Sequence, residues 1–150
     1  MVKNLFILGF IFIFVGMIPI ARIFFNSSRV SLNANVSQGQ IDGSRLLNLI
    51  QKFRTTSGKK PYRQSRFLCY VAETRLMEVK SDFSHKGFFE WRFCPGCGLG
   101  ENLARGFNSE ETLLAAWINS SSHLANLNAN YSHSCLKTDG ETVVQIFGYF

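Results

Sequence analysis

The stretch GENLARGFNSEETLLAAWINSSSH, residues 100–123, holds the most informative pattern of the chain. It begins with a carboxylate, Glu101, and ends with an imidazole, His123. Between them, Asn108 or Ser109 can cap a helix, because either side chain accepts a hydrogen bond from the first helical turn. Glu110 and Glu111 follow in that turn, where their negative charges suit the positive end of the helix dipole. An apolar stripe at helical spacing completes the pattern: Leu113, Leu114, Trp117 and Ile118.

Two more helices are predicted before this stretch. The first begins at Asp42 or Ser44 and stops near Gly58, and the second runs over residues 65–80. Their inward faces carry apolar residues three and four positions apart. These residues are Leu46, Leu47, Ile50 and Phe53 in the first helix and Leu68, Val71, Ala72, Leu76 and Val79 in the second.

The remaining pattern predicts loops, a short helix and two strands. Residues 81–100 are rich in glycine, which predicts a loop. A short helical turn is expected over residues 123–127. Residues 142–150 are β-branched and aromatic, which predicts a strand, and residues 134–138 can pair with it through a turn at Asp139-Gly140. The fold class is therefore α+β, in one domain spanning residues 41–150.

The N-terminus carries an apolar segment of the kind that reaches a membrane. Leu5 to Ala21 contains no charged residue, and it lies between Lys3 and Arg22. Residues 1–25 therefore predict a signal-anchor or a signal peptide. We favour an uncleaved anchor over a cleaved signal, because no convincing cleavage site follows. Residues 26–40 are rich in Ser, Asn and Gln and predict a flexible linker.

The charge of the chain is unevenly distributed. The 150 residues carry a net charge of +6, but the first 66 hold ten of the 16 basic side chains and one acid. Because residues 67–150 are slightly acidic, no nucleic-acid partner is expected. A run of seven basic residues has no acid within it: Arg45, Lys52, Arg54, Lys59, Lys60, Arg63 and Arg66. It is typical of a solvated helix face, or of a surface that attracts anionic lipid headgroups or an acidic wall polymer.

Several separate blocks together resemble one known family. They are FSHKGF at residues 83–88, GENLA at 100–104, the Trp117 to His123 block, and QIFG at 145–148. In this order and spacing they resemble the CAP superfamily (cysteine-rich secretory proteins, antigen 5 and pathogenesis-related proteins), in its compact prokaryotic form. The resemblance covers about residues 41–150. It implies an α-β-α sandwich with an open cleft that holds two histidines and acidic partners.

The resemblance places three residues in this cleft. His85 matches the first cleft histidine, Glu101 the first acid and His123 the second histidine. The position of the second acid is taken by Ser120. In relatives the cleft can bind a divalent metal, commonly zinc, so His85 and His123 are the expected metal ligands.

Two imidazoles and a carboxylate allow more than one chemistry. With Zn²⁺ or another divalent cation they would leave an open position for water. Without metal, Glu101 would hydrogen-bond one histidine and fix its tautomer.

The four cysteines also admit several interpretations. Cys94 and Cys97 have the spacing of a redox pair, but the glycines that follow oppose the helix such a pair needs. A zinc knuckle would need Cys69 and Cys135, which are single and far apart. We favour two disulfides, Cys94–Cys97 and Cys69–Cys135, and hence an oxidising compartment.

These observations predict a membrane-tethered, extracytoplasmic CAP domain, or a secreted one if the N-terminal segment is cleaved. Its His/Glu cleft would bind a ligand: a divalent metal, a lipid or a component of the cell envelope. The alternative is a metal-assisted or Ser/His hydrolase that uses the same cleft, with Ser84, Ser121 or Ser122 as the neighbouring hydroxyl. No nucleophile-elbow motif supports the hydrolase, so we favour binding. A third, purely structural interpretation has the basic face dock to the envelope.

Overall fold

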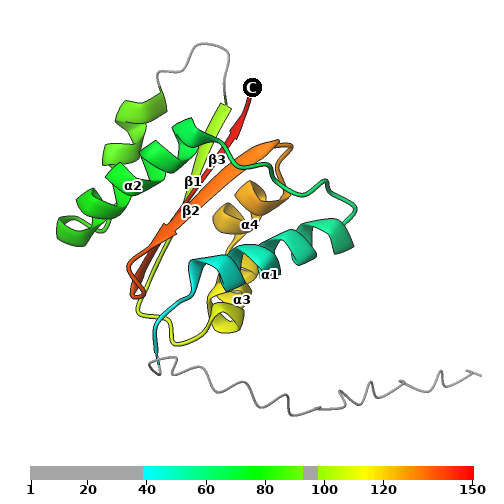
Figure 1. Cartoon of the computed structure of the whole chain (residues 1–150), viewed down its shortest axis with the longest axis horizontal. Coiled ribbons are helices and arrows are strands. Elements are labelled where there is room, and N and C mark those ends of the chain that lie inside the picture. The colour runs from blue at the N-terminus through cyan, green and yellow to red at the C-terminus, as the bar shows by residue number, and fades with distance from the viewer. Residues whose placement is uncertain (1–38, 93–97) are drawn as a thin grey trace, which may run out of the picture. The chain divides into compact units, whose positions relative to one another are not determined.

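A computed structural model of the chain describes residues 39–92 and 98–150 (Figure 1). The predicted anchor, residues 1–25, lies outside this described part, as does nearly all of the predicted linker. Within the two described ranges, no helix combines the length and the apolar character needed to cross a bilayer.

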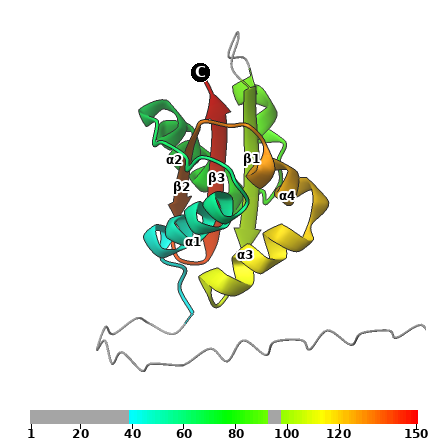
Figure 2. The same ribbon diagram turned by 90° about the vertical axis from the view of Figure 1, so that its right-hand side faces the viewer.

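The described residues form helices on both faces of an antiparallel sheet (Figures 1 and 2). Helix α2 covers one face, and helices α1, α3 and α4 cover the other. The α-helices are α1 (Gly43–Thr56), α2 (Arg66–Ser81), α3 (Glu110–Asn119) and α4 (Ser121–Asn128). A 3₁₀ helix, η1 (Gly87–Arg92), and strands β1 (Gly98–Arg105), β2 (His133–Thr138) and β3 (Thr142–Tyr149) complete the domain.

The helices begin at capping residues that the sequence predicts. The Asp42 carboxylate accepts from the backbone amide of Ser44 at 2.7 Å and so caps α1. Ser109 caps α3 by accepting from the Thr112 amide at 3.2 Å. Each cap satisfies an amide that has no partner within its own helix, which fixes where the helix starts.

Strand β3 lies at the centre of the sheet, in the order β1-β3-β2. Because successive side chains point to opposite faces, β3 contributes to two cores. Val143 and Phe147 pack with α1, α3 and α4. Val144 and Ile146 pack with α2. Burial on both faces explains why the sequence of β3 is almost continuously apolar.

The structure corrects the prediction that residues 81–100 form a loop. Residues 87–92 form η1, and β1 begins at Gly98 and pairs with β3 along its whole length. The usual apolar alternation is missing from β1, because glycines stand where aromatic side chains approach. A Cβ on Gly98 would collide with the Tyr149 ring, and one on Gly100 would lie 2.8 Å from the Tyr131 hydroxyl.

A disulfide between Cys69 and Cys135 joins α2 to β2, with the two Cα atoms 5.0 Å apart. This part of the predicted cysteine pairing is confirmed. The second predicted pair, Cys94–Cys97, lies outside the described residues.

Candidate functional site

Glu101 projects from the middle of β1 toward α2 and is almost fully buried. Its carboxylate accepts two hydrogen bonds from the Arg75 guanidinium, from Nε at 2.8 Å and from Nη2 at 3.3 Å. This two-point contact matches the planar fork of arginine to a carboxylate, and it neutralises the buried acid.

Arg75 is itself 1% exposed and has further partners around it. It forms an ion pair with Glu78 on the same helix, and its Nη2 donates to the carbonyl of Ser84 at 2.7 Å. Gly87 lies directly over this group, where any Cβ would collide with the guanidinium. Burial alone would lower the pKa of Arg75, but the hydrogen bonds and charges of Glu101 and Glu78 raise it overall.

His85 lies in the segment between α2 and η1, next to Ser84. Its Nδ1 is 2.8 Å from Oε1 of Glu101. A carboxylate paired with arginine can only accept, so Nδ1 carries the proton and donates it. The Nε2 atom takes no part in this contact. The side chain is 48% exposed, which makes this ring the solvent-facing member of the Arg75–Glu101–His85 group.

His123 lies on α4, on the other side of β1 from α2. Its Nδ1 is 2.9 Å from the Ser120 hydroxyl, and its backbone carbonyl accepts from Asn102 at 3.2 Å. Burial, and then the nearby charge of His85, lower the pKa of His123 below its usual value of 6.5. The histidines are thus near enough to interact electrostatically, whereas Glu101 bonds only one of them among the described residues.

A cavity of about 330 Å³ opens beside His85 and Glu101. Asn126, on α4, fixes its position in the wall by donating to the Glu101 carbonyl at 3.0 Å and to the Asn102 side chain at 2.9 Å. The lining combines aromatic, aliphatic and hydrogen-bonding groups: His85, Phe88, Phe89, Leu99, Gly100, Glu101, Asn126 and Tyr131. Among the described residues, this lining leaves out His123.

Sequence reasoning missed Arg75, Asn126 and Tyr131. A signal for Arg75 was present, since it follows Val71 by four positions and so falls within the apolar stripe of its helix. A charge at such a position indicates a buried partner. For Asn126 and Tyr131 the sequence carries no comparable signal, because their positions depend on contacts with β1 and β3.

The donor groups present do not fit a three-ligand zinc site. Both oxygens of Glu101 are occupied by Arg75 and His85, and Ser120 stands where the resemblance implies a second acid. Among residues 39–92 and 98–150, no cluster of three or more His, Cys, Asp or Glu side chains is placed to hold a metal ion. Two imidazoles alone would hold zinc weakly.

No protein-family model and no curated protein matches the chain in sequence. Solved structures do match. A cysteine-rich secretory protein from Staphylococcus aureus superposes with a TM-score of 0.63 at 22% identity, over 72% of this chain and 38% of that one. An extracellular SCP-domain protein from Bacillus anthracis gives 0.59 at 20% identity, over 71% and 40%. An outer surface protein from Borrelia burgdorferi gives 0.61 at 20% identity, over 75% and 98%.

The chain thus spans well under half the length of the first two proteins and nearly the whole of the third. With the order of helices and strands described above, these superpositions show that the chain has the fold of the CAP (SCP) domain.

Proposed function

We propose that the chain is an extracytoplasmic binding module, tethered to a membrane by residues 1–25, whose cavity beside His85 holds a neutral ligand of the cell envelope. One observation carries the proposal: the buried carboxylate of Glu101 is already neutralised by Arg75. A ligand therefore meets hydrogen-bonding groups and aromatic rings rather than a net charge. The disulfide supports an oxidising compartment. The similar proteins are described as secretory, extracellular or outer-surface, which supports the same location.

The lining indicates the chemistry of the ligand. Nε2 of His85 and the side chain of Asn126 offer hydrogen bonds. Phe89, which is 53% exposed, and Leu99 offer apolar contact. Hydroxyl groups beside an apolar face meet both needs, so the proposed class is a sugar or glyceride group.

The test is an NMR titration of the full chain in a nonionic detergent. The probes are a dimer of N-acetylglucosamine, the soluble glyceride monohexanoylglycerol and Zn²⁺, each added separately. We expect one of the two neutral probes to shift the amide signals of residues 85–89 and 99–101. The variants His85→Ala and Phe89→Ala should each weaken the binding of that probe by about tenfold.

Met77→Ala is the matched control, because Met77 is 62% exposed on α2 and lies away from the cavity lining. Binding that survives both cavity variants would contradict the proposal. Tight Zn²⁺ binding that is lost in both His85→Ala and His123→Ala would instead establish the metal site predicted from the sequence.

The hydrolase alternative has one contact in its favour, the 2.9 Å separation between Nδ1 of His123 and the Ser120 hydroxyl. Such a pair also needs an acid that orients the imidazole. Glu101 is bonded to His85 and Arg75 instead. The geometry therefore favours binding over hydrolysis. An esterase activity abolished by Ser120→Ala would reverse this choice.

A further inference from the structure

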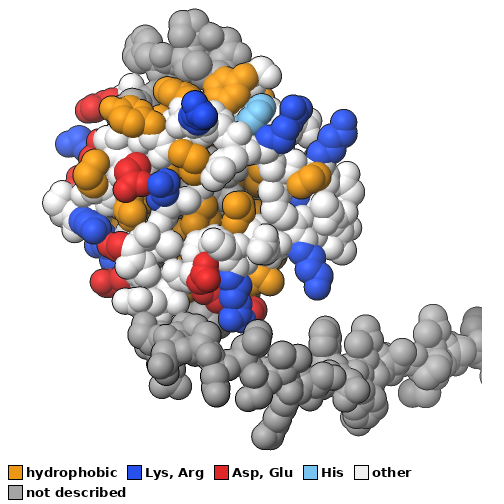
Figure 3. Space-filling view, viewed as in Figure 1, with side chains coloured by type: hydrophobic (Ala, Val, Ile, Leu, Met, Phe, Trp, Pro, Cys, Tyr) orange, Lys and Arg blue, Asp and Glu red, His pale blue; other side chains and the backbone are white. Residues whose placement is uncertain are grey.

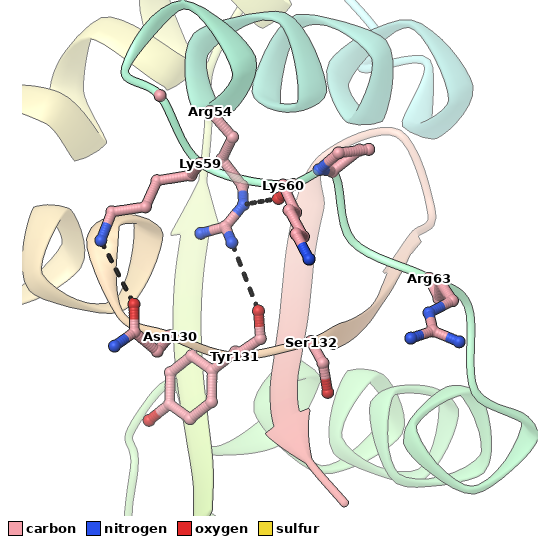
Figure 4. Close-up of a pocket in the computed structure, with 9 residues that line it drawn as sticks. Arg54, Lys59, Lys60, Arg63, Asn130, Tyr131 and Ser132 are labelled. Atoms are coloured by element: carbon pink, nitrogen blue, oxygen red, sulfur yellow. Dashed lines mark hydrogen bonds between the residues drawn. The ribbon is translucent and has the colours of Figure 1, made fainter.

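A second and larger cavity, of about 450 Å³, lies at the C-terminal end of α1 (Figure 4). Its walls come from the segment after α1 and from the segment between α4 and β2. Four of the nine lining residues are cationic and none is acidic. We call this cavity the basic pocket. Its nine lining residues are Arg54, Gly58, Lys59, Lys60, Pro61, Arg63, Asn130, Tyr131 and Ser132.

The floor of the basic pocket is a buried cation without an acidic partner. Arg54 is 2% exposed. Its Nε donates to the carbonyl of Lys60 at 3.0 Å, and its Nη1 donates to the Tyr62 hydroxyl at 2.8 Å and to the Leu127 carbonyl at 2.6 Å. Figure 4 draws the contact with Lys60 and a further one, in which Nη2 donates to the Tyr131 carbonyl at 3.3 Å. The guanidinium carbon also lies 3.7 Å from the centre of the Tyr62 ring. Among the described residues, all these partners of Arg54 are neutral, so no carboxylate compensates its buried charge.

The rim adds more positive charge, which is also unbalanced. The Lys59 ammonium donates to the Asn130 side chain at 3.3 Å, and Lys60 and Arg63 are exposed. Within the described ranges, none of these three forms an ion pair. Elsewhere the cations Lys80 and Lys137 do pair, with carboxylates at 3.0 Å and 2.6 Å.

The surface view shows the same contrast. Over the C-terminal end of α1 and the segment that follows it, on the right of Figure 3, basic side chains gather without acids beside them. Over α2, on the left, acidic and basic side chains alternate. A hollow lined by one sign of charge concentrates its field on a small volume, which favours a compact anion.

We propose that the basic pocket binds a phosphate group. Arginine and lysine together offer the forked and the single N–H donors that phosphate oxygens accept. The group can belong to a soluble phosphate ester or to a lipid headgroup, because both present the same oxygens. This site is separate from the cavity at His85, although Tyr131 contributes to the walls of both.

The experiment measures binding of inorganic phosphate to the full chain in nonionic detergent, by calorimetry and by amide chemical shifts. We expect shifts at residues 58–63 and 130–132. The double variant Lys60→Gln, Arg63→Gln should weaken the binding of phosphate by at least ~10-fold. These side chains are exposed, so the melting temperature should not change.

Two single variants match each other as test and control. Lys60→Gln removes one charge from the pocket rim. Lys52→Gln removes one charge from the exposed face of α1, away from the pocket. We expect weaker phosphate binding in the first and unchanged binding in the second.

A further arm separates the two sources of phosphate. Detergent micelles doped with phosphatidylglycerol present a lipid headgroup, and glycerol 3-phosphate presents its soluble counterpart. Tighter binding to the doped micelles, lost in the double variant, would assign the site to lipid. Binding to glycerol 3-phosphate alone, with the same loss, would assign it to a soluble ester. If no phosphate compound binds, or if Lys52→Gln weakens binding as much as Lys60→Gln, the proposal is wrong.

Discussion

Arg54 on α1 and Arg75 on α2 are both almost completely buried, but the fold compensates their charges in opposite ways. Arg75 faces two carboxylates, Glu101 and Glu78. Arg54 faces backbone carbonyls and a tyrosine hydroxyl. Arg54 lines the basic pocket, and Arg75 acts on the cavity beside His85 through Glu101, which lines it. The mode of compensation therefore sets the charge of each cavity. The charges around the cavity beside Glu101 are balanced, and the basic pocket at Arg54 is positive.

This difference shows that residue type alone does not define a binding site. The cavity beside Glu101 contains titratable groups, but they satisfy one another and leave hydrogen-bonding capacity without net charge. The basic pocket contains no acid, and its charge is available to a ligand. The same contrast extends to how the two helices are fastened. A disulfide ties α2 to the sheet, whereas the hydrogen bonds of Arg54 fasten α1 to the last turn of α4 and the segment after it.

The largest effect is expected from removing the covalent tie that only α2 has. Cys69 and Cys135 are 66 residues apart in sequence. On the chain-entropy model, a loop of this length contributes about 4 kcal/mol to the free energy of unfolding. Urea denaturation of the Cys69→Ser, Cys135→Ser variant should show that loss. A loss below about 1 kcal/mol would mean that packing alone holds α2 on the sheet.

The next effect comes from breaking the buried ion pair. Glu101→Ala leaves the Arg75 guanidinium buried with only Glu78 beside it. We expect a loss of about 3 kcal/mol, at the low end for a broken buried pair because one partner remains. Urea denaturation measures this loss. The double variant Arg75→Met, Glu101→Ala should recover part of the stability, and no recovery would contradict the account of a coupled pair.

A smaller effect is expected at Arg54. Arg54→Met removes several hydrogen bonds from a charged donor, but it also removes a buried charge that has no acidic partner. The net loss should therefore be about 2 kcal/mol, less than for Glu101→Ala. Thermal unfolding of Arg54→Met and Glu101→Ala in the same buffer shows which variant loses more stability. The reverse order would mean that the carbonyl cage compensates Arg54 better than the carboxylates compensate Arg75.

The smallest effect is a pH dependence that arises at His123. Its pKa is lowered in the folded state, chiefly by burial. Below its usual pKa of 6.5, the unfolded chain therefore binds a proton that the folded chain resists. The free energy of unfolding should fall as the pH drops from 6.5 through the lowered pKa. His123→Gln should flatten this part of the curve, and an unchanged slope would show that another group titrates there.

Much of the fold follows from local sequence patterns. The caps at Asp42 and Ser109, the apolar stripes of α1 to α3 and the β2–β3 hairpin all follow from spacing and turn residues. Strand β1 could not be predicted in this way. Its buried positions include Glu101 and Asn102, whose partners come from α2 and α4, so the apolar alternation that identifies a strand is absent.

The candidate site was predictable only in part, for the same physical reason. The motif blocks give His85 and Glu101, which the structure brings to 2.8 Å. The charge compensation that defines each cavity depends on Arg75 and Arg54, and both lie within apolar stripes of their helices. The sequence alone does not reveal whether such an arginine meets a carboxylate or a carbonyl, because that depends on which strand or loop packs against it.

One measurement compares the two cavities directly: the anomalous diffraction of a crystal soaked in bromide. Both cavities are sampled by the same anion in the same map. We expect a bromide peak among Lys60, Arg63 and the floor at Arg54, and no peak within contact distance of His85 and Glu101. A peak at His85 with none above Arg54 would contradict the assignment of charge on which the account rests.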